Sequence, residues 1–141
     1  MKKIILAAAA VILLSMVARG ADITMKQLPK TAQAFITQYF PTDRIAKIGM
    51  NTDRSTKEYK VLFQDGSKIK FDQNGQWTKI KLRNDSIPVE IIPEYITTYV
   101  WEMYPNILIM SIEQEGTGHE VELSDGTELT FNAKGNVVKI D

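Results

Sequence analysis

Two stretches of the chain repeat each other, and this duplication constrains the possible fold more than any other sequence feature. Residues 65–80 and 125–140 align without a gap and share Asp, Gly, Phe, Gly, Lys and Ile in register. Upstream, each copy has two prolines twelve residues apart: Pro29, Pro41, Pro93 and Pro105. The upstream offset is 93 − 29 = 64 and the downstream offset is 125 − 65 = 60, so the first copy has four additional residues. We expect these residues to form a longer loop at residues 51–57.

The residue pattern of each copy predicts one helix followed by four short strands. Between the prolines, apolar residues recur at the spacing of a helix with one buried side, and proline suits both the first turn and the end of such a helix. Downstream, alternating apolar and polar residues predict strands. The dipeptides that separate these strands favour type I′ hairpin turns: Asp65-Gly66, Asn74-Gly75, Asp125-Gly126 and Lys134-Gly135.

These repeated features resemble the tandem PepSY-like domains of small exported bacterial proteins, a family also described as β-lactamase-inhibitor-like. The resemblance covers the chain after residue 20 and implies an α+β fold. Two helix-plus-four-strand repeats would form one curved antiparallel sheet, with both helices packed on one face and the other face open. In the β-lactamase inhibitory protein, the open face grips the target enzyme. None of its binding residues matches this chain by position, so β-lactamase inhibition is not carried over.

The first twenty residues have the features of a cleaved signal peptide. Two lysines precede an apolar run over residues 4–17, and a site of small residues ends at Gly20. The run is shorter than the roughly 20 residues that a membrane-spanning helix needs. We expect cleavage after Gly20, no membrane anchor afterwards, and a periplasmic or secreted protein. Its two repeats, residues 21–86 and 87–141, are predicted to form one cooperative unit because each is too small to be comfortably stable alone.

Charge is distributed unequally between the two copies. Residues 21–86 contain 12 basic and 7 acidic side chains, whereas residues 87–141 contain 2 and 10. Outward strand positions carry lysine in the first copy, and several corresponding positions in the second carry Glu120, Glu128 or Thr130. The sequence leaves three explanations open. The sheet face could be solvated, with charges that protect its edges; the copies could attract each other; or a partner could have the opposite polarity.

A candidate binding face can be assigned to the first copy. Trp77 is out of phase with Thr78 and Ile80, which predicts that it points to the open face, and an exposed Trp among lysines is a common interface anchor. The alternative is that Trp77 covers the sheet edge or packs on a lysine stem. Trp101 is expected to pack against the neighbouring copy. The predicted binding face consists of Trp77, Lys60, Lys68, Lys70, Lys79 and Lys81.

Few side chains suit catalysis or metal binding. The chain contains no Cys and one histidine, His119, which we expect to be half-buried at a strand end. Residues 72–75, DQNG, resemble a calcium loop only in part and are interpreted as a turn. Hydrolase, metalloprotease, phosphate-loop and dinucleotide motifs are absent from the sequence. We therefore predict no catalytic residues, no cofactor, no metal site and no enzyme activity. Nucleic-acid binding is disfavoured because export separates the protein from that ligand.

Two functions from different classes remain. The first is an exported, non-catalytic module that uses its open sheet face to bind a protein, or to inhibit one, such as a cell-envelope or secreted enzyme. Its partner would be a protein of the cell envelope, and no oligomeric state is specified. The second is a carrier or sensor that uses Trp77 and its lysines to bind a small or polymeric anionic envelope ligand. A deep pocket behind Trp77 would favour the second function, and a broad, shallow face the first.

Overall fold

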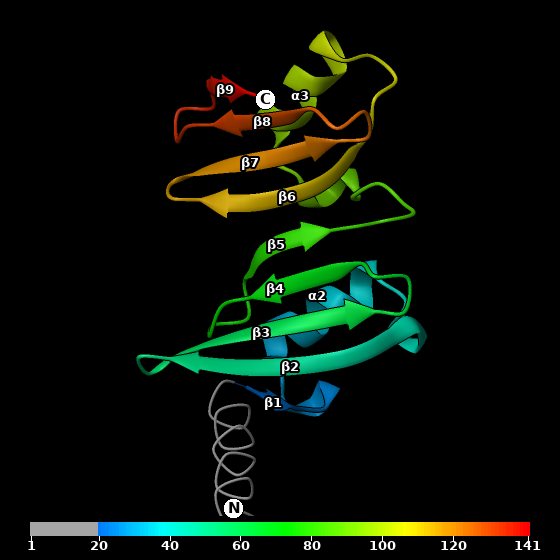
Figure 1. The fold of residues 1–141 in the computed structure, drawn as a ribbon, viewed down its shortest axis with the longest axis vertical. Coiled ribbons are helices and arrows are strands. Elements are labelled where there is room, and N and C mark those ends of the chain that lie inside the picture. Colours follow the sequence, from blue (N-terminus) through cyan, green and yellow to red (C-terminus); the bar gives the residue numbers. More distant parts are fainter. Residues whose placement is uncertain (1–19) are drawn as a thin grey trace, which may run out of the picture.

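The computed structural model describes residues 20–141, so all of the predicted signal peptide except Gly20 lies outside the described residues. The fold is one open antiparallel sheet whose nine strands lie side by side in chain order (Figure 1). The strands are β1 (Ala21–Asp22), β2 (Ile45–Asp53), β3 (Thr56–Phe63), β4 (Lys68–Phe71), β5 (Trp77–Lys81), β6 (Ile109–Glu115), β7 (Gly118–Leu123), β8 (Glu128–Phe131) and β9 (Val137–Ile140).

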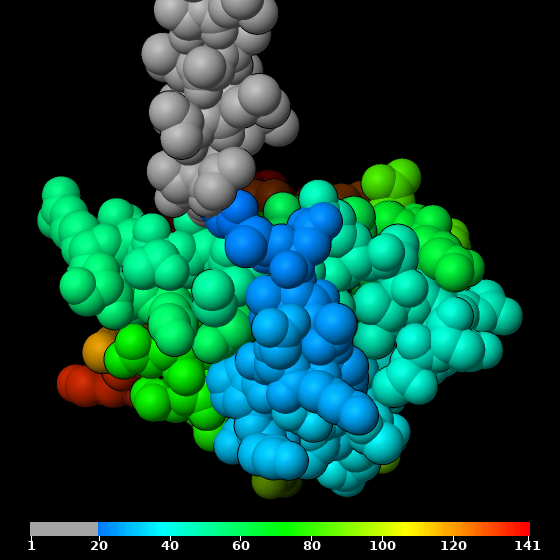
Figure 2. Space-filling model, turned by 90° about the horizontal axis from the view of Figure 1, so that it is seen from below, coloured from blue at the N-terminus to red at the C-terminus, as the bar shows by residue number. Residues whose placement is uncertain are grey.

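Both helices pack on the same face of this sheet, which confirms the predicted fold class. Helix α2 (Lys30–Tyr39) precedes β2, and helix α3 (Glu94–Met103) precedes β6, so each repeat is a helix followed by four strands. Short 3₁₀ turns are η1 (Met25–Gln27), η2 (Thr42–Arg44) and η3 (Val89–Ile91). Strand β1 and η1 run across the end of the sheet before α2, as the blue residues of Figure 2 show. Within residues 20–141, no helix lies over the opposite sheet face (Figure 1).

The helices begin and end where the prolines predict. Pro29 and Pro93 each lie immediately before the first helical residue, with backbone φ of −54° and −53°. A proline at this point loses no helical hydrogen bond, because the first N–H groups of a helix have no partner within it. Each helix buries one stripe of side chains against the sheet, Ala32 and Ile36 in α2, and Ile96, Thr97 and Val100 in α3.

The four additional residues of the first copy do not form a longer loop, so that prediction is wrong. Strand β2 has 9 residues against 7 in β6, and β3 has 8 against 6 in β7. Both hairpins close with a two-residue turn, Arg54-Ser55 in the first copy and Gly116-Thr117 in the second. The additional residues therefore lengthen the β2–β3 hairpin by two residue pairs.

The predicted type I′ turns also need correction. A type I′ turn requires positive φ at both central residues. In the Asp65-Gly66 pair, Gly66 has positive φ and Asp65 does not. The Gly66 N–H donates to the Phe63 carbonyl oxygen over 3.0 Å. The Phe63 N–H in turn donates to the Ser67 carbonyl oxygen. The loop therefore consists of residues 64–66, and Gly66 has the left-handed backbone conformation. Type I′ geometry occurs instead at Arg54 and Ser55, whose φ values are 50° and 71°.

The two copies share one core because their strands pair directly. Strand β5, the last of the first copy, pairs with β6, the first of the second, and we call this junction the seam. Ile80 lies opposite Ile112 across the seam, and neither is exposed to solvent. Leu82 N–H donates to the Met110 carbonyl oxygen over 2.9 Å. The connecting segment is fixed to the seam as well, since Ile87 N–H donates to the Ile109 carbonyl oxygen over 2.9 Å.

This shared core leads to a stability prediction. Phe71 and Phe131 occupy equivalent positions in the two copies and have exposed fractions of 0% and 1%. We expect Phe71→Ala and Phe131→Ala each to lower the free energy of unfolding by about 3–5 kcal/mol, because each loses transfer energy and leaves a cavity. In thermal unfolding followed by calorimetry, each variant should shift one common transition. Two separate transitions, each sensitive to only one substitution, would show that the copies fold independently.

The open sheet face as a candidate binding surface

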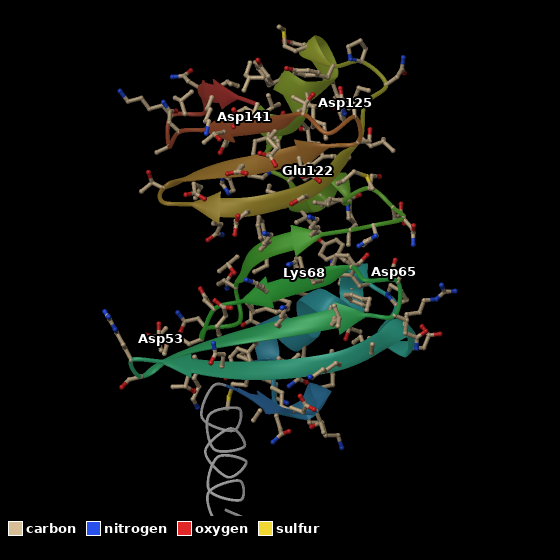
Figure 3. The ribbon with its side chains drawn as sticks, viewed as in Figure 1. Asp53, Asp65, Lys68, Glu122, Asp125 and Asp141 are labelled. Carbon is tan, nitrogen blue, oxygen red and sulfur yellow. The ribbon has the colours of Figure 1, made fainter. Side chains whose placement is uncertain are left out.

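Cross-strand pairing arranges the charged side chains of the open face in two rows. The first row runs from Lys60 through Lys70 and Lys79 to Glu113 and Glu120. The second runs through Lys68, Lys81, Ser111, Glu122 and Glu128. We call Lys60, Lys68, Lys70, Lys79 and Lys81 the lysine patch, and Glu113, Glu120, Glu122 and Glu128 the acidic patch. Figure 3 labels one residue of each, Lys68 on β4 and Glu122 on β7.

The seam separates the two patches. All residues of the lysine patch lie on β3, β4 and β5, and all those of the acidic patch lie on β6, β7 and β8. The patches meet at Lys79 and Glu113, whose side-chain N and O atoms are 3.8 Å apart. The sequence pattern predicts the lysines, but it does not predict that Glu113 and Glu122 belong to the same surface. Only the pairing of β5 with β6 places them in line with the lysines.

The lysine patch repels itself. The pKa of Lys68 is lowered from its usual value of 10.5, first by partial burial and then by the positive charges of the four other lysines of the patch. One acid lies close to these lysines from within the first copy, Glu58, which is 4.0 Å from the Lys70 ammonium. Positive charge at this density attracts an anionic surface.

The acidic patch shows the same behaviour with the opposite sign. The pKa of Glu120 is raised from its usual value of 4.5, first by burial and then by repulsion from Glu128, Glu115 and Glu113. Lys139 on β9 opposes this shift. The open face therefore has two neighbouring regions of opposite charge, and in each of them like charges are held close together.

Trp77 does not belong to this surface, so that part of the predicted binding face is wrong. A β-bulge between Lys79 and Trp77 places one additional residue, Thr78, on β5. A bulge of this kind reverses the alternation of side chains beyond it. Trp77 consequently lies opposite Phe71, on the helix-covered face, where it is partly buried against the core. The five predicted lysines remain together on the open face.

Trp77 packs into a small aromatic cluster under helix α3. Its ring centroid is 6.3 Å from that of His119, and the His119 ring is 6.2 Å from Tyr95 on α3. The Tyr95 hydroxyl and His119 Nδ1 are 2.8 Å apart and share a hydrogen bond. Burial lowers the pKa of His119 below its usual value of 6.5. His119 is half-buried at the start of β7, as predicted.

Trp101 also differs from its prediction. We expected it to pack against the neighbouring copy, but 62% of the residue is exposed on α3. The helical spacing explains this, because Val100 points into the core and the next residue is rotated by about 100° around the helix axis. Trp77, predicted to be exposed, is thus partly buried, and Trp101, predicted to be packed, is exposed.

Trp77 lines neither of two hollows on the described surface. The larger, about 480 Å³, lies on the open face around Gly49, with Lys47, Lys60 and Lys70 at its rim together with Asp22 and Glu58. The smaller, about 360 Å³, lies between the copies near Arg83 and Gly126. In the larger hollow, acids already lie near two of the lysines, since Lys47 is 3.4 Å from Asp22 and Lys70 is 4.0 Å from Glu58.

The acidic side chains of the described residues do not form a metal site. Within residues 20–141, no three His, Asp or Glu side chains lie close enough together to hold a metal ion. The predicted turn at residues 72–75 is confirmed, because the Asp72 side chain accepts hydrogen bonds from the N–H groups of Asn74 and Gln76. None of the helices in the described part of the chain is long and apolar enough to cross a membrane.

Comparison with known proteins identifies the family. The sequence profile of the family described as β-lactamase-inhibitor-like, PepSY-like matches residues 15–56 and 57–139. The chain belongs to this PepSY-like family. The resemblance inferred from the repeated motifs is thereby confirmed. Among curated proteins, none gives a significant match.

Solved structures with the fold of this PepSY-like protein are described as periplasmic. A protein of the DUF2874 family from Bacteroides vulgatus, provisionally described as periplasmic, is 38% identical, with a TM-score of 0.82, and the match covers 86% of this chain and 96% of that one. A protein from Bacteroides thetaiotaomicron, provisionally described as calcium-regulated and periplasmic, is 39% identical, with a TM-score of 0.80 and the same coverage. A second periplasmic protein from B. vulgatus, described as of unknown function, is 28% identical, with a TM-score of 0.79 over 86% of this chain and 98% of that one. These neighbours support an exported, periplasmic module.

The two Trp residues provide a direct test of the corrected surface. We expect Trp77→Ala to lower the free energy of unfolding by about 1–3 kcal/mol, less than for a fully buried aromatic, because Trp77 is partly buried. Trp101→Ala is the matched control and should change it by no more than about 0.5 kcal/mol. Chemical denaturation of both variants measures the difference. An unchanged stability for Trp77→Ala would contradict its assignment to the helix-covered face.

Proposed function

We propose that this PepSY-like protein is a non-catalytic periplasmic binding module that docks a protein partner on its open sheet face. The observation that carries this proposal is the division of that face into a lysine patch and an acidic patch that meet at the Lys79–Glu113 pair. We also propose that the mature protein begins at Ala21, which the intact mass of the exported protein tests.

The arrangement of the sheet supports this use. One face packs against two helices and supplies the buried core, so the fold depends mainly on the residues of that face. Residues on that opposite face can therefore change without loss of the fold. In addition, a sheet fixes the spacing of its outward side chains at about 4.8 Å between strands, which gives a partner a regular pattern of charge to match.

The charge pattern indicates the kind of partner. A protein surface can place acidic groups over the lysine patch and basic groups over the acidic patch at the same time. Such complementarity increases the rate of association and orients the partner. If the partner is an envelope or secreted enzyme, docking inhibits it wherever the open face covers the active site.

The alternative function, a carrier of an anionic envelope ligand, loses its predicted anchor. That proposal combined Trp77 with the lysines, whereas Trp77 lies on the other side of the sheet. The larger hollow does carry lysines, but Asp22 and Glu58 lie beside them and offset their charge. The acidic patch would also repel an anionic polymer that extended beyond the seam.

Affinity capture with charge variants tests the proposed function. Mature protein is immobilised and exposed to envelope extract of the source bacterium, and bound proteins are identified by mass spectrometry. The test variant is Lys68→Glu, which should keep its stability because it removes repulsion from the centre of the lysine patch. The control is Lys30→Glu, which changes the net charge equally but lies on helix α2.

We expect a specific protein to be captured by the wild type and by Lys30→Glu. With Lys68→Glu, its association should slow about tenfold or more at low salt, with a smaller difference at high salt, because screening weakens the charge contribution. Equal capture by all three proteins would place the binding surface elsewhere. Capture of a polyanion without protein would support the carrier function instead.

A further inference from the structure

The open face is self-complementary in charge, because its lysine patch and acidic patch lie on corresponding strands on the two sides of the seam. Nine strands lie in chain order, and the seam is the junction between β5 and β6. Counting outward from the seam, β5 corresponds to β6, β4 to β7 and β3 to β8. The lysine patch occupies the first strand of each of these pairs, and the acidic patch occupies the second.

A two-fold axis that runs along the strands at the seam would place one open face against the open face of another copy. Rotation by 180° about this axis turns the sheet over and exchanges β4 with β7. Lys70 would then lie over Glu120 of the second copy, because both belong to the same cross-strand row. In the second row, Lys68 would lie over Glu122. Each contact would occur twice, as two-fold symmetry requires.

The other in-plane two-fold axis, perpendicular to the strands, gives an unfavourable face-to-face arrangement. A two-fold axis in the plane of the sheet but perpendicular to the strands would place β4 over β4 and β7 over β7. Lysines would then face lysines and glutamates would face glutamates, which costs free energy. Charge therefore selects the axis along the strands. Two sheets stacked in this way pack about 10 Å apart with their strands nearly aligned, a separation that long Lys and Glu side chains can span.

We propose that the open face docks a second copy of this chain, giving a symmetric dimer held by lysine-to-glutamate contacts across the seam axis. The like-charge repulsion around Lys68 and Glu120 supports it, since a second copy relieves both at once. This inference rests on the proposed function in that it uses the same face as a docking surface. It adds a regulatory consequence: the dimer covers the face, so a foreign partner must compete with the second copy.

Exchange of charges between the two patches provides the experiment. The variants are Lys70→Glu and Glu120→Lys, examined separately, mixed together, and combined in one chain. Mature protein is studied by sedimentation velocity at about 50 mM and 500 mM NaCl, two conditions that differ about threefold in Debye length. The controls are Lys30→Glu and Glu102→Lys, which change the net charge equally but lie on the helices.

We expect wild type and both controls to dimerise at low salt and to dissociate at high salt. Each single patch variant should weaken the dimer about tenfold or more, because it places like charges opposite each other twice. Mixing the two variants should restore a dimer, since the new glutamate of the Lys70→Glu chain then faces the new lysine of the Glu120→Lys chain. The double variant should also dimerise.

A wild type that stays monomeric at low salt would overturn the inference, as would single variants whose dimerisation is unaffected or is not recovered on mixing. Its failure can be separated from failure of the proposed function. A monomer that captures a protein partner through the lysine patch would overturn the dimer and leave the function intact. A dimer that captures no protein would leave the dimer and overturn the function.

Discussion

The pairing of β5 with β6 is the interaction on which the rest of the structure depends. Three residue pairs join these strands, among them Ile80 with Ile112 on the covered side and Lys79 with Glu113 on the open side. The first pair makes one core from the buried residues of two copies that would each be marginal alone. The second brings two charged patches into a single surface. Fold and candidate site thus share the same few hydrogen-bonded residues.

Much of this fold could be predicted because the duplication repeats its local signals. Proline brackets set the helix ends, Asp-Gly and Asn-Gly dipeptides located turns, and alternation located strands. The lengthened β2–β3 hairpin was missed because Arg54 and Ser55 are not typical of a type I′ turn, although both have positive φ. A two-residue turn with unusual residues looks like a longer loop when only composition is considered.

The candidate site was only partly predictable, and Trp77 shows why. Strict alternation from Ile80 assigns Trp77 to the open face, but the bulge at Thr78 inserts one residue and moves Trp77 to the covered face. A single inserted residue reverses every side chain beyond it. Glu113 and Glu122 of the acidic patch were missed for a different reason, because their alignment with the lysines depends on pairing between strands of different copies.

The central claim, that the two copies form one continuous unit through the seam, is tested most directly by native-state hydrogen exchange. The Leu82 amide donates across the seam to Met110, so its exchange reports on separation of the copies. If the claim is correct, amides of β5 and β6 at the seam exchange with the same opening free energy as those in the centres of β3 and β7, equal to global unfolding. Seam amides that exchange through a much less costly opening, while β3 and β7 stay protected, would contradict it.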